Sequence, residues 1–190
     1  YITFARDYNT SKSVVIKIGN AFNIFFHVLR TRLFGDHLGG SKLATLSLIK
    51  KIKKIKPDII HLHQLHGYYL HIPILFNFLK SLKTPVVWTI HDNWAFTEIP
   101  FGSYPKSLFL DKSKQNFLRK KKIFTNISNL RLVGVSKWIR DLAKNSFLNN
   151  FDISTIPNGI DISVFYPRNN KSHILKKYNL NTKKKYLIAS

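Results

Sequence analysis

Apolar residues follow two patterns along this chain: a helical repeat, which predicts α-helices, and short continuous runs, which predict β-strands. Apolar residues recur every three to four positions over residues 43–55, which predicts a helix. Its outer face is rich in lysine, and Pro57 ends it. Further helices are predicted over residues 72–82, 114–124 and 137–147. The first helix is predicted near the start of the chain, with one apolar face formed by Phe22, Phe25, Phe26, Leu29 and Leu33.

Short continuous apolar runs predict the strands. "PVVWTIH" and "LRLVGVS" contain several β-branched residues, which is typical of strands buried on both faces. Because such runs alternate with helices, the sequence predicts an α/β fold with a doubly wound, mainly parallel, Rossmann-like sheet. The predicted strands are "YITFAR", "DIIHLH", "PVVWTIH", "LRLVGVS" and "DISTI".

The composition changes after Tyr166, where the polar segment "PRNNKS" is typical of a linker. A short helix ending at Tyr178 and a last strand, "KYLIAS", are predicted beyond it. We therefore expect one domain over residues 1–166 and the start of a second over residues 167–190. The chain begins without Met on a strand already under way, so we expect a fragment.

The charge narrows the classes of partner. Lys and Arg total 31 against 9 Asp and Glu, a net charge of +22, and the runs "KKIKKIK" and "RKKK" concentrate it. Such a charge favours nucleic acid, anionic lipid or phosphorylated substrates, whereas the simpler alternative is a solvated helix surface. The absence of cysteine excludes disulfides and thiolate metal sites, and no apolar run has the roughly 18 residues that a membrane span needs.

Histidines gather at two predicted strand ends. His61 and His63 close the run "DIIHLH", His66 lies in the loop beyond it, and His91 with Asp92 follows the next strand. Carboxyl ends of parallel strands meet at one edge of a sheet, so we expect a cleft there. A zinc site would need three well-placed protein ligands, each oriented by a further hydrogen bond, and this pattern does not supply them. We expect His63, His66 and His91 to contact a ligand. For His61 the alternative is a structural hydrogen bond inside the sheet.

Five segments in order identify a family resemblance: "PDIIHLHQLHGYYL", "PVVWTIHDNWAFT", "YPKSLFLDKSKQNF", "LRLVGVSKWIRDLAKNSFL" and "STIPNGIDISVFYP". Together they resemble the N-terminal half of a bacterial family-four glycosyltransferase of GT-B fold, of the capsule, exopolysaccharide and colanic-acid assembly type. The resemblance implies a retaining transferase that uses a nucleotide sugar and no metal or other cofactor. Its N-terminal half binds the acceptor and its C-terminal half binds most of the donor.

The resemblance also implies roles for individual residues. His91 would be catalytic through a hydrogen bond to the transferring sugar, and Asp92 would orient that imidazole or bind an acceptor hydroxyl. The resemblance places the donor phosphates near backbone N–H groups and a helix N-terminus, which attract anions, although "PNGID" could also be a plain turn. The implied acceptor-binding residues are His63, His66, Trp94 and Thr97. The implied donor-binding residues are Ser136, Asn158, Gly159 and Asp161.

The sequence departs from the family at three places. The family's first strand with its glycine-rich loop is missing, the paired glutamates of the second domain are absent, and only "EIPFGS" stands where relatives have a longer segment. We therefore expect an incomplete GT-B N-terminal domain that is inactive alone. The resemblance implies a cytoplasmic location, peripheral on the inner face of the plasma membrane, and a saccharide or polyprenyl-linked saccharide acceptor.

Two alternatives from other classes are a basic nucleic-acid-binding protein and a peripheral membrane module. The first lacks any helix-turn-helix, zinc-finger or RNP pattern, so we expect no specific nucleic acid. The second is compatible with the transferase. In it, the aromatic face of residues 22–34 and the lysines of residues 42–54 would meet an anionic membrane surface, whereas the alternative places those aromatic rings in the core.

Overall fold

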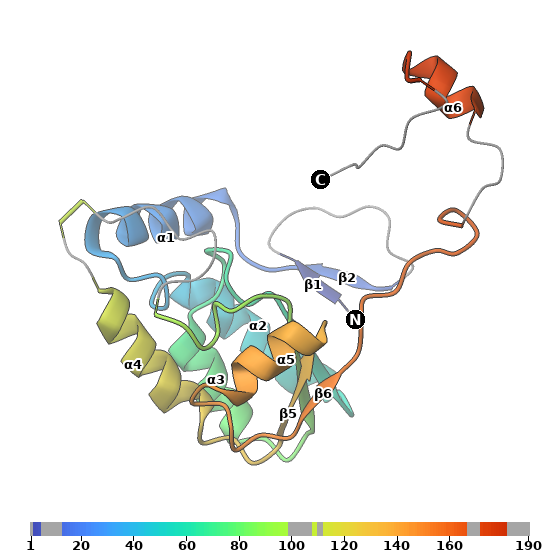
Figure 1. Ribbon diagram of the computed structural model, residues 1–190. Helices are drawn as coiled ribbons and strands as arrows, with labels where there is room; N and C mark the ends of the chain where they lie inside the picture. Colours follow the sequence, from blue (N-terminus) through green and yellow to red (C-terminus); the bar gives the residue numbers. More distant parts are fainter. Residues whose placement is uncertain (1, 5–12, 99–107, 110–111, 167–171, 182–190) are drawn as a thin grey trace. The chain divides into compact units, whose positions relative to one another are not determined.

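The computed structural model describes residues 2–4, 13–98, 108–109, 112–166 and 172–181 (Figure 1). The chain forms two compact units, Tyr1–Pro157 and Asn158–Ser190. The domain boundary expected after Tyr166 stays a prediction. The strand expected in "KYLIAS" lies outside the described residues.

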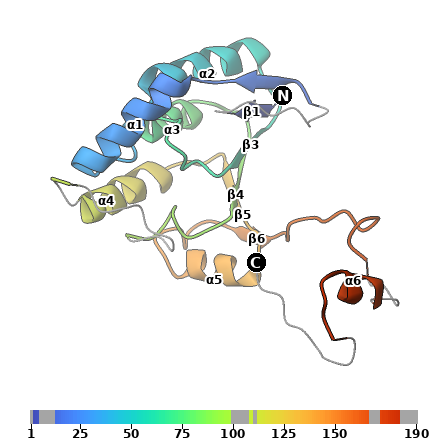
Figure 2. The same ribbon diagram turned by 90° about the horizontal axis from the view of Figure 1, so that it is seen from above.

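The first unit is built on a four-stranded sheet whose neighbouring strands are all parallel. This arrangement confirms the parallel α/β fold predicted from the sequence. In spatial order the strands are β3 (Ile60–His63), β4 (Val86–Ile90), β5 (Leu130–Gly134) and β6 (Ile153–Thr155) (Figure 2). The helices that connect them are α3 (Ile72–Lys80), α4 (Ser113–Phe124) and α5 (Lys137–Lys144).

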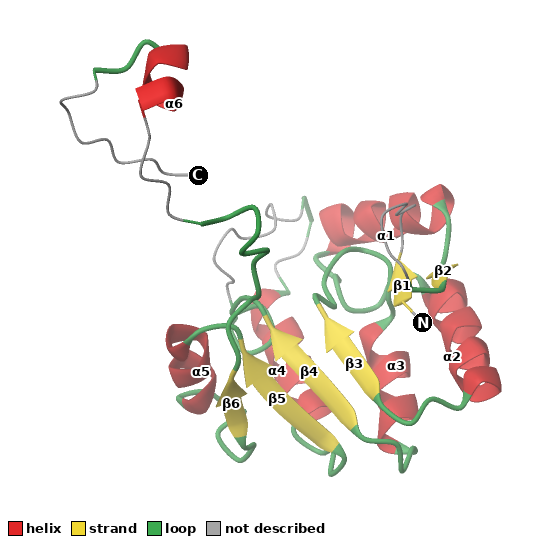
Figure 3. Cartoon of the chain, turned by 90° about the vertical axis from the view of Figure 1, so that its right-hand side faces the viewer, coloured by secondary structure: helices red, strands yellow, loops and turns green. Residues whose placement is uncertain are grey.

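The sheet is covered more fully on one face than on the other. Helices α3 and α4 lie behind it in Figure 3, where the open face is toward the viewer. All three crossovers step in the same direction along the sheet, and right-handed crossovers of that kind place their helices on one side. On the open face His61 and Arg131 are exposed. The expectation that "LRLVGVS" is buried on both faces is therefore wrong, because Arg131 faces the open side of β5.

The core lies between the covered face of the sheet and its helices. Three aromatic rings meet there: the centroids of Phe76 and Phe124 are 4.6 Å apart, and those of Trp88 and Phe124 are 4.9 Å apart. All three side chains are almost completely buried. Since Trp88 belongs to β4, Phe76 to α3 and Phe124 to α4, this contact fixes both helices against the sheet.

The start of the chain forms a separate pair of parallel strands, β1 (Ile2–Phe4) and β2 (Val15–Lys17). The strand expected over residues 1–6 is thus present in part, and β2 was not predicted. Helices α1 (Ala21–Phe34) and α2 (Lys42–Ile55) follow. Asn20 and Asn23 form a reciprocal capping box at the start of α1, and Gly35 ends it with a φ of 67°.

The aromatic face of α1 points to solvent. Phe22, Phe25 and Phe26 are 72%, 59% and 62% exposed, while α1 buries His27 and Thr31 instead. The alternative that placed these three rings in the core is therefore wrong. On α2 the apolar side chains also divide, because Leu48 and Ile49 are buried and Leu43 and Leu46 are exposed. Periodicity located both helices correctly but did not give the side that packs.

The second unit contains one short helix among its described residues, α6 (Ser172–Lys177), which buries none of its side chains. Before it, Asp161 accepts hydrogen bonds at Oδ1 from the backbone N–H and the hydroxyl of Ser163, at 2.9 and 2.6 Å. Across both units, no helix in the described part of the chain is long and apolar enough to cross a bilayer.

Candidate functional site

Two histidines meet at the carboxyl ends of β3 and β4, as the sequence predicted. His63 is the last residue of β3 and His91 follows β4, and the two strands pair in parallel. The distance from His63 Nδ1 to His91 Nε2 is 2.9 Å. One of these nitrogens must donate the hydrogen bond and the other must accept it. The tautomer of one histidine therefore depends on the tautomer of the other. Burial lowers the pKa of His63, and the neighbouring His61 and His91 lower it further.

His61 supports this pair from the open face of the sheet. Its Nε2 lies 2.8 Å from the hydroxyl oxygen of Thr89, and its ring centroid is 4.1 Å from that of His63. The hydrogen bond fits the structural alternative for this histidine, although the side chain is exposed and not enclosed in a crevice.

The loop after β4 joins a second histidine to Asp92. Asp92 Oδ2 lies 3.1 Å from His66 Nε2, and Oδ1 accepts the backbone N–H of Trp94 at 2.9 Å. Burial would raise the pKa of Asp92, but the hydrogen bonds from His66 and Trp94 outweigh it and lower the pKa. The expected partnership of Asp92 with the His91 ring is therefore not the one observed, since His66 holds the carboxylate.

Trp94 and Thr97 have supporting positions in this loop. Trp94 is 2% exposed, and the His66 ring stacks on it at 5.2 Å between centroids. The hydroxyl of Thr97 donates to the carbonyl oxygen of Asn93 at 2.8 Å. Sequence reasoning assigned both to acceptor contacts, but Trp94 is covered by His66, and Thr97 bonds within its own turn.

Lys120 of α4 holds the same loop and was not predicted as a site residue. Its side chain is 1% exposed, and Nζ donates to the carbonyl oxygens of Trp94 and Thr97 at 2.6 and 2.7 Å. Burial lowers its pKa to about 8, opposed by the charge of Asp92. In the sequence Lys120 belongs to the run "RKKK", but it lies four residues from Asn116 and from Phe124, both buried. That spacing of four marks the inner face of α4.

A charged network lies beside the loop. Asp36, between α1 and α2, accepts hydrogen bonds from Arg30 at 2.8 Å and from Arg119 of α4 at 2.9 Å. Burial would raise its pKa, yet the two guanidinium groups lower the pKa to about 2. The adjacent His37 has a pKa lowered to about 3 by burial and by the charge of Lys120. Its ring lies 6.1 Å from that of Trp94.

The predicted donor residues are divided between the two units. Ser136 follows β5 and caps α5, its hydroxyl oxygen accepting the N–H of Ile139 at 3.2 Å, as the sequence predicted. Asn158, Gly159 and Asp161 belong to the second unit and are exposed there. The first unit thus brings together His63, His66, His91 and Asp92. In its described residues, and in those of the second unit, no group of three or more His, Asp or Glu side chains is arranged to hold a metal ion.

The chain thus has the architecture of the parallel α/β class, in which ligands bind beyond the carboxyl ends of the strands. The chain belongs to Glycosyltransferase Family 4, whose family model matches residues 5–164. It is 27% identical, over 132 residues of alignment, to WcaC of Escherichia coli (strain K12), named as a colanic acid biosynthesis glycosyl transferase. The alignment covers 56% of this chain and 32% of that relative's length. The resemblance found in the five sequence segments is therefore confirmed.

Proposed function

We propose that this chain is the acceptor-binding half of a retaining glycosyltransferase that transfers a hexose from a nucleotide sugar to a saccharide acceptor. The observation that carries the proposal is the 2.9 Å contact between His63 and His91 at the carboxyl edge of the sheet. Family membership supports the reaction class. Similarity to a colanic acid biosynthesis glycosyl transferase supports a role in exopolysaccharide or capsule synthesis.

In the proposed reaction His91 hydrogen-bonds the transferring sugar, and His63 selects its tautomer. If His63 donates its Nδ1–H to Nε2 of His91, the remaining proton of a neutral His91 sits on Nδ1 and is available to a sugar hydroxyl. The low pKa of His63 favours its neutral form near pH 7. The proposal includes no metal or other cofactor.

In this proposal the acceptor and the donor bind to separate sets of polar residues. His66 and Asp92 bind acceptor hydroxyls, because both side chains of this contact are only partly buried, with 26% and 38% of their surface exposed. Ser136 and the first turn of α5 face the donor phosphates, since backbone N–H groups at a helix start attract anions. For Asn158, Gly159 and Asp161 of the second unit, the donor-binding role implied by the resemblance stays a prediction.

Replacement of His91 tests the proposed catalytic role. The assay uses an enzyme in which this chain is joined to a donor-binding domain. His91→Ala should lower kcat about 100-fold, the loss typical of one preorganised donor, with a smaller change in the acceptor KM.

His61→Ala is the matched control, since the His61 ring lies 4.1 Å from the His63 ring but hydrogen-bonds to Thr89 instead. It should lower the free energy of unfolding and change kcat much less than His91→Ala does. Equal kinetic losses for the two variants, or an unchanged kcat for His91→Ala, would contradict the assignment.

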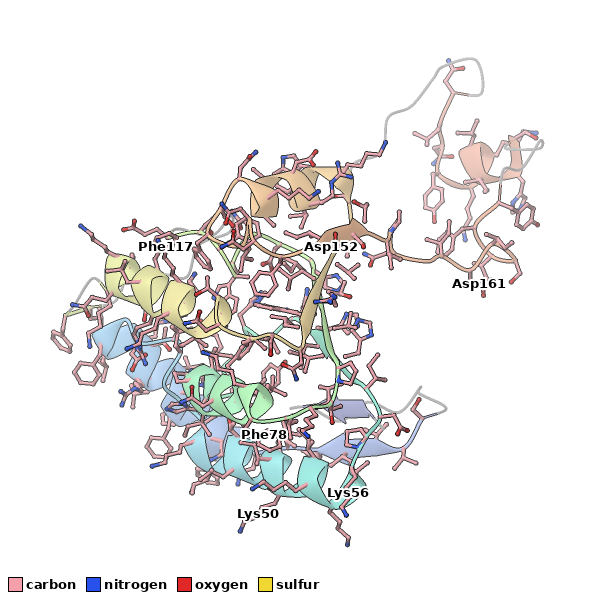
Figure 4. The ribbon with its side chains drawn as sticks, turned by 90° about the horizontal axis from the view of Figure 1, so that it is seen from below. Lys50, Lys56, Phe78, Phe117, Asp152 and Asp161 are labelled. Atoms are coloured by element: carbon pink, nitrogen blue, oxygen red, sulfur yellow. The ribbon has the colours of Figure 1, made fainter. Side chains whose placement is uncertain are left out.

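We further propose that the protein is peripheral on the cytoplasmic face of the plasma membrane and takes a polyprenyl-linked acceptor. Its exposed aromatic face on α1 suits the interface of a bilayer. On α2, Lys50 extends away from the sheet (Figure 4), and Lys54 is exposed one turn later. Two further lysines of this run make contacts within the fold: Nζ of Lys51 donates to the carbonyl oxygen of Lys17, and Nζ of Lys53 lies over the ring of Phe78.

Vesicle sedimentation tests this location. The double variant Lys50→Gln/Lys54→Gln should weaken binding to anionic vesicles by roughly 2 kcal/mol, or about 30-fold, because each lysine contributes about 1 kcal/mol. The control is Lys121→Gln/Lys122→Gln, which removes two exposed charges from α4. Equal losses for both pairs, or full binding to neutral vesicles, would refute a specific membrane face.

A further inference from the structure

Trp138 differs from the other two tryptophans of the chain, because its side chain is open to solvent. Trp88 and Trp94 are each 2% exposed, whereas Trp138 is 57% exposed. Tryptophan is highly buried on average, since its ring is large and mostly apolar. An indole ring left in water at this edge of the fold is therefore a candidate for contact with a ligand.

The helix that carries Trp138 is held closely against the sheet. On α5, Ile139 and Ala143 are 2% and 0% exposed. A Cβ atom on Gly134 would lie 3.0 Å from the backbone nitrogen of Arg140, so α5 passes close to the end of β5. The ring of Trp138 is thus presented by a backbone that a ligand would not have to order on binding.

The start of α5 lies beside the histidine pair. The backbone N–H of Val135 donates to the carbonyl oxygen of Ile90 at 3.4 Å, and His91 follows Ile90 directly. Ser136 then caps the helix, so Trp138 is only three residues beyond this contact. Side chains of a helix lean toward its N-terminus. The indole of Trp138 therefore leans toward the carboxyl edge of the sheet, where His91 lies.

A carboxylate lies next to the indole on the same face of α5. Asp141 comes three residues after Trp138, a spacing that makes two side chains neighbours on a helix. Its side chain is 56% exposed, and Arg140 holds it through Nε and Nη2, which lie 2.9 and 2.7 Å from Oδ1. The other oxygen, Oδ2, has no hydrogen-bond partner among the described residues, so it can accept hydrogen bonds from a ligand.

An indole face beside a carboxylate suits a sugar ring. The face of an aromatic ring carries partial negative charge, and the C–H groups on one side of a pyranose carry partial positive charge, so the two stack. The hydroxyl groups around the stacked pyranose can donate hydrogen bonds to a carboxylate, which only accepts them. A nucleobase could also stack on the indole. The position beside His91 favours a sugar, because the reacting sugars meet there in the proposed reaction.

We propose that Trp138 and Asp141 bind a pyranose ring of the acceptor saccharide, with its apolar side against the indole and a hydroxyl on Oδ2 of Asp141. The proposal rests on the proposed sugar transfer, in which His91 contacts the transferring sugar. The N–H groups at the start of α5 point along the helix axis, whereas Trp138 and Asp141 project from its side. Donor phosphates and the acceptor ring can therefore be bound together.

Saturation-transfer difference NMR of the 190-residue chain tests the contact, with methyl β-D-galactopyranoside and methyl β-D-glucopyranoside as probes. We expect at least one glycoside to bind, with the strongest saturation on the ring protons of its stacked side. Trp138→Ala should weaken this binding about tenfold, whereas Trp138→Phe keeps an aromatic face and should retain most of it. Asp141→Asn should weaken it by about fivefold, through loss of a charged hydrogen-bond acceptor.

Intrinsic fluorescence gives a second measurement, because Trp88 and Trp94 are buried. A saccharide on the indole of Trp138 should displace water and shift the emission to shorter wavelength. In Trp138→Phe this shift should disappear while the NMR signal of the bound glycoside remains. That combination would identify Trp138 as the ring in contact.

Matched controls separate this pair from other exposed side chains. Phe22→Ala removes an exposed ring from α1, and Asp152→Asn neutralises an exposed carboxylate at the amino end of β6. Both should leave glycoside binding within about twofold of wild type, as surface changes away from a site do. Trp138 and Asp141 are themselves exposed, so their variants should melt at the wild-type temperature.

Kinetics of the enzyme joined to a donor-binding domain distinguish the two substrates. Trp138→Ala should raise the acceptor KM about tenfold, with smaller changes in kcat and in the donor KM. A larger rise in the donor KM, or an equal NMR response to uridine and to the glycosides, would assign the ring to the donor and overturn the proposal.

Absence of glycoside binding would also overturn it, as would equal losses for Trp138→Ala and Phe22→Ala. None of these results decides whether the enzyme transfers sugar, because His91→Ala tests the transfer separately through kcat. A failed contact at Trp138 and a failed assignment of His91 therefore give different results.

Discussion

The buried lysine of α4 offers a sharp test of how the site is held. Lys120 Nζ donates to the carbonyl oxygens of Trp94 and Thr97 and lies 5.2 Å from the centroid of the Trp94 ring. Lys120→Met keeps an unbranched side chain of similar length and removes the donor group. Lys121→Met is the control, because Lys121 is exposed on the same helix.

Two effects of opposite sign determine the magnitude. The variant leaves two carbonyl oxygens without this donor, which costs roughly 1–3 kcal/mol for each. It also removes a charge that burial disfavours. The fall of the Lys120 pKa from 10.5 to about 8 corresponds to about 3 kcal/mol. The net change of stability at pH 7 should therefore be small, between a gain of about 1 kcal/mol and a loss of about 3 kcal/mol.

The pH dependence has a definite sign. Above pH 8 the folded chain releases the Lys120 proton, while the unfolded chain keeps it up to about pH 10.5. The unfolded state then binds more protons, so Lys120 contributes more stability as the pH rises through this window. A neutral amine still has two N–H groups for its two carbonyl partners. The destabilisation caused by Lys120→Met should therefore increase by about 3 kcal/mol between pH 8 and pH 10.5.

Urea unfolding followed by circular dichroism, for wild type and both variants at several pH values, measures these differences. Other groups titrate equally in all three proteins and cancel in the comparison. A difference between wild type and Lys120→Met that is independent of pH, or that shrinks as the pH rises, would refute a buried cation. So would an equal effect of Lys121→Met.

Two more predictions concern the turn between α1 and α2. Asp36→Asn should destabilise the chain by about 2 kcal/mol at pH 7, because the pKa of Asp36 lies near 2. That stability is present above pH 4 and lost as the pH falls through 2, so wild type and variant should converge in acid unfolding. Gly40→Ala should cost about 1–3 kcal/mol, because its Cβ would overlap His27. Gly159→Ala, which meets nothing within 4 Å, should leave the melting temperature unchanged, and equal shifts would contradict the close-packed turn.

The alternation of apolar runs and helical repeats was sufficient to predict the sheet. β3, β4, β5 and β6 all occur where the runs "DIIHLH", "PVVWTIH", "LRLVGVS" and "DISTI" placed them. The convergence of His63 and His91 followed from parallel pairing, since equivalent strand ends share one edge. These predictions depend on local spacing and on topology, which a sequence contains.

The parts that were missed depend on which side of an element packs. The aromatic face of α1 has the spacing of a core face, yet His27 and Thr31 occupy that place. Periodicity defines a face but not its partner. Lys120 was hidden because a run of four basic residues suggests a solvated surface, and its partners are backbone carbonyl oxygens that no composition reveals. Asp92 contacts His66 and not the His91 ring because of the loop geometry, which residue spacing alone does not determine.

The two open surfaces of the first unit differ in chemistry, and the difference decides which of them needs a partner. The open face of the sheet presents polar side chains such as His61, Arg131 and Ser154, which water can solvate at little cost. The open face of α1 presents three phenylalanines more than half exposed, and contiguous apolar surface of that kind marks an interaction site. A cation, Lys42 at the start of α2, lines the same hollow as Phe26. An apolar surface with a cation beside it matches an anionic lipid better than it matches a sugar or a nucleotide. We therefore propose that α1 and α2 make the lipid contacts, and that the histidines at the carboxyl edge of the sheet take part in the sugar chemistry.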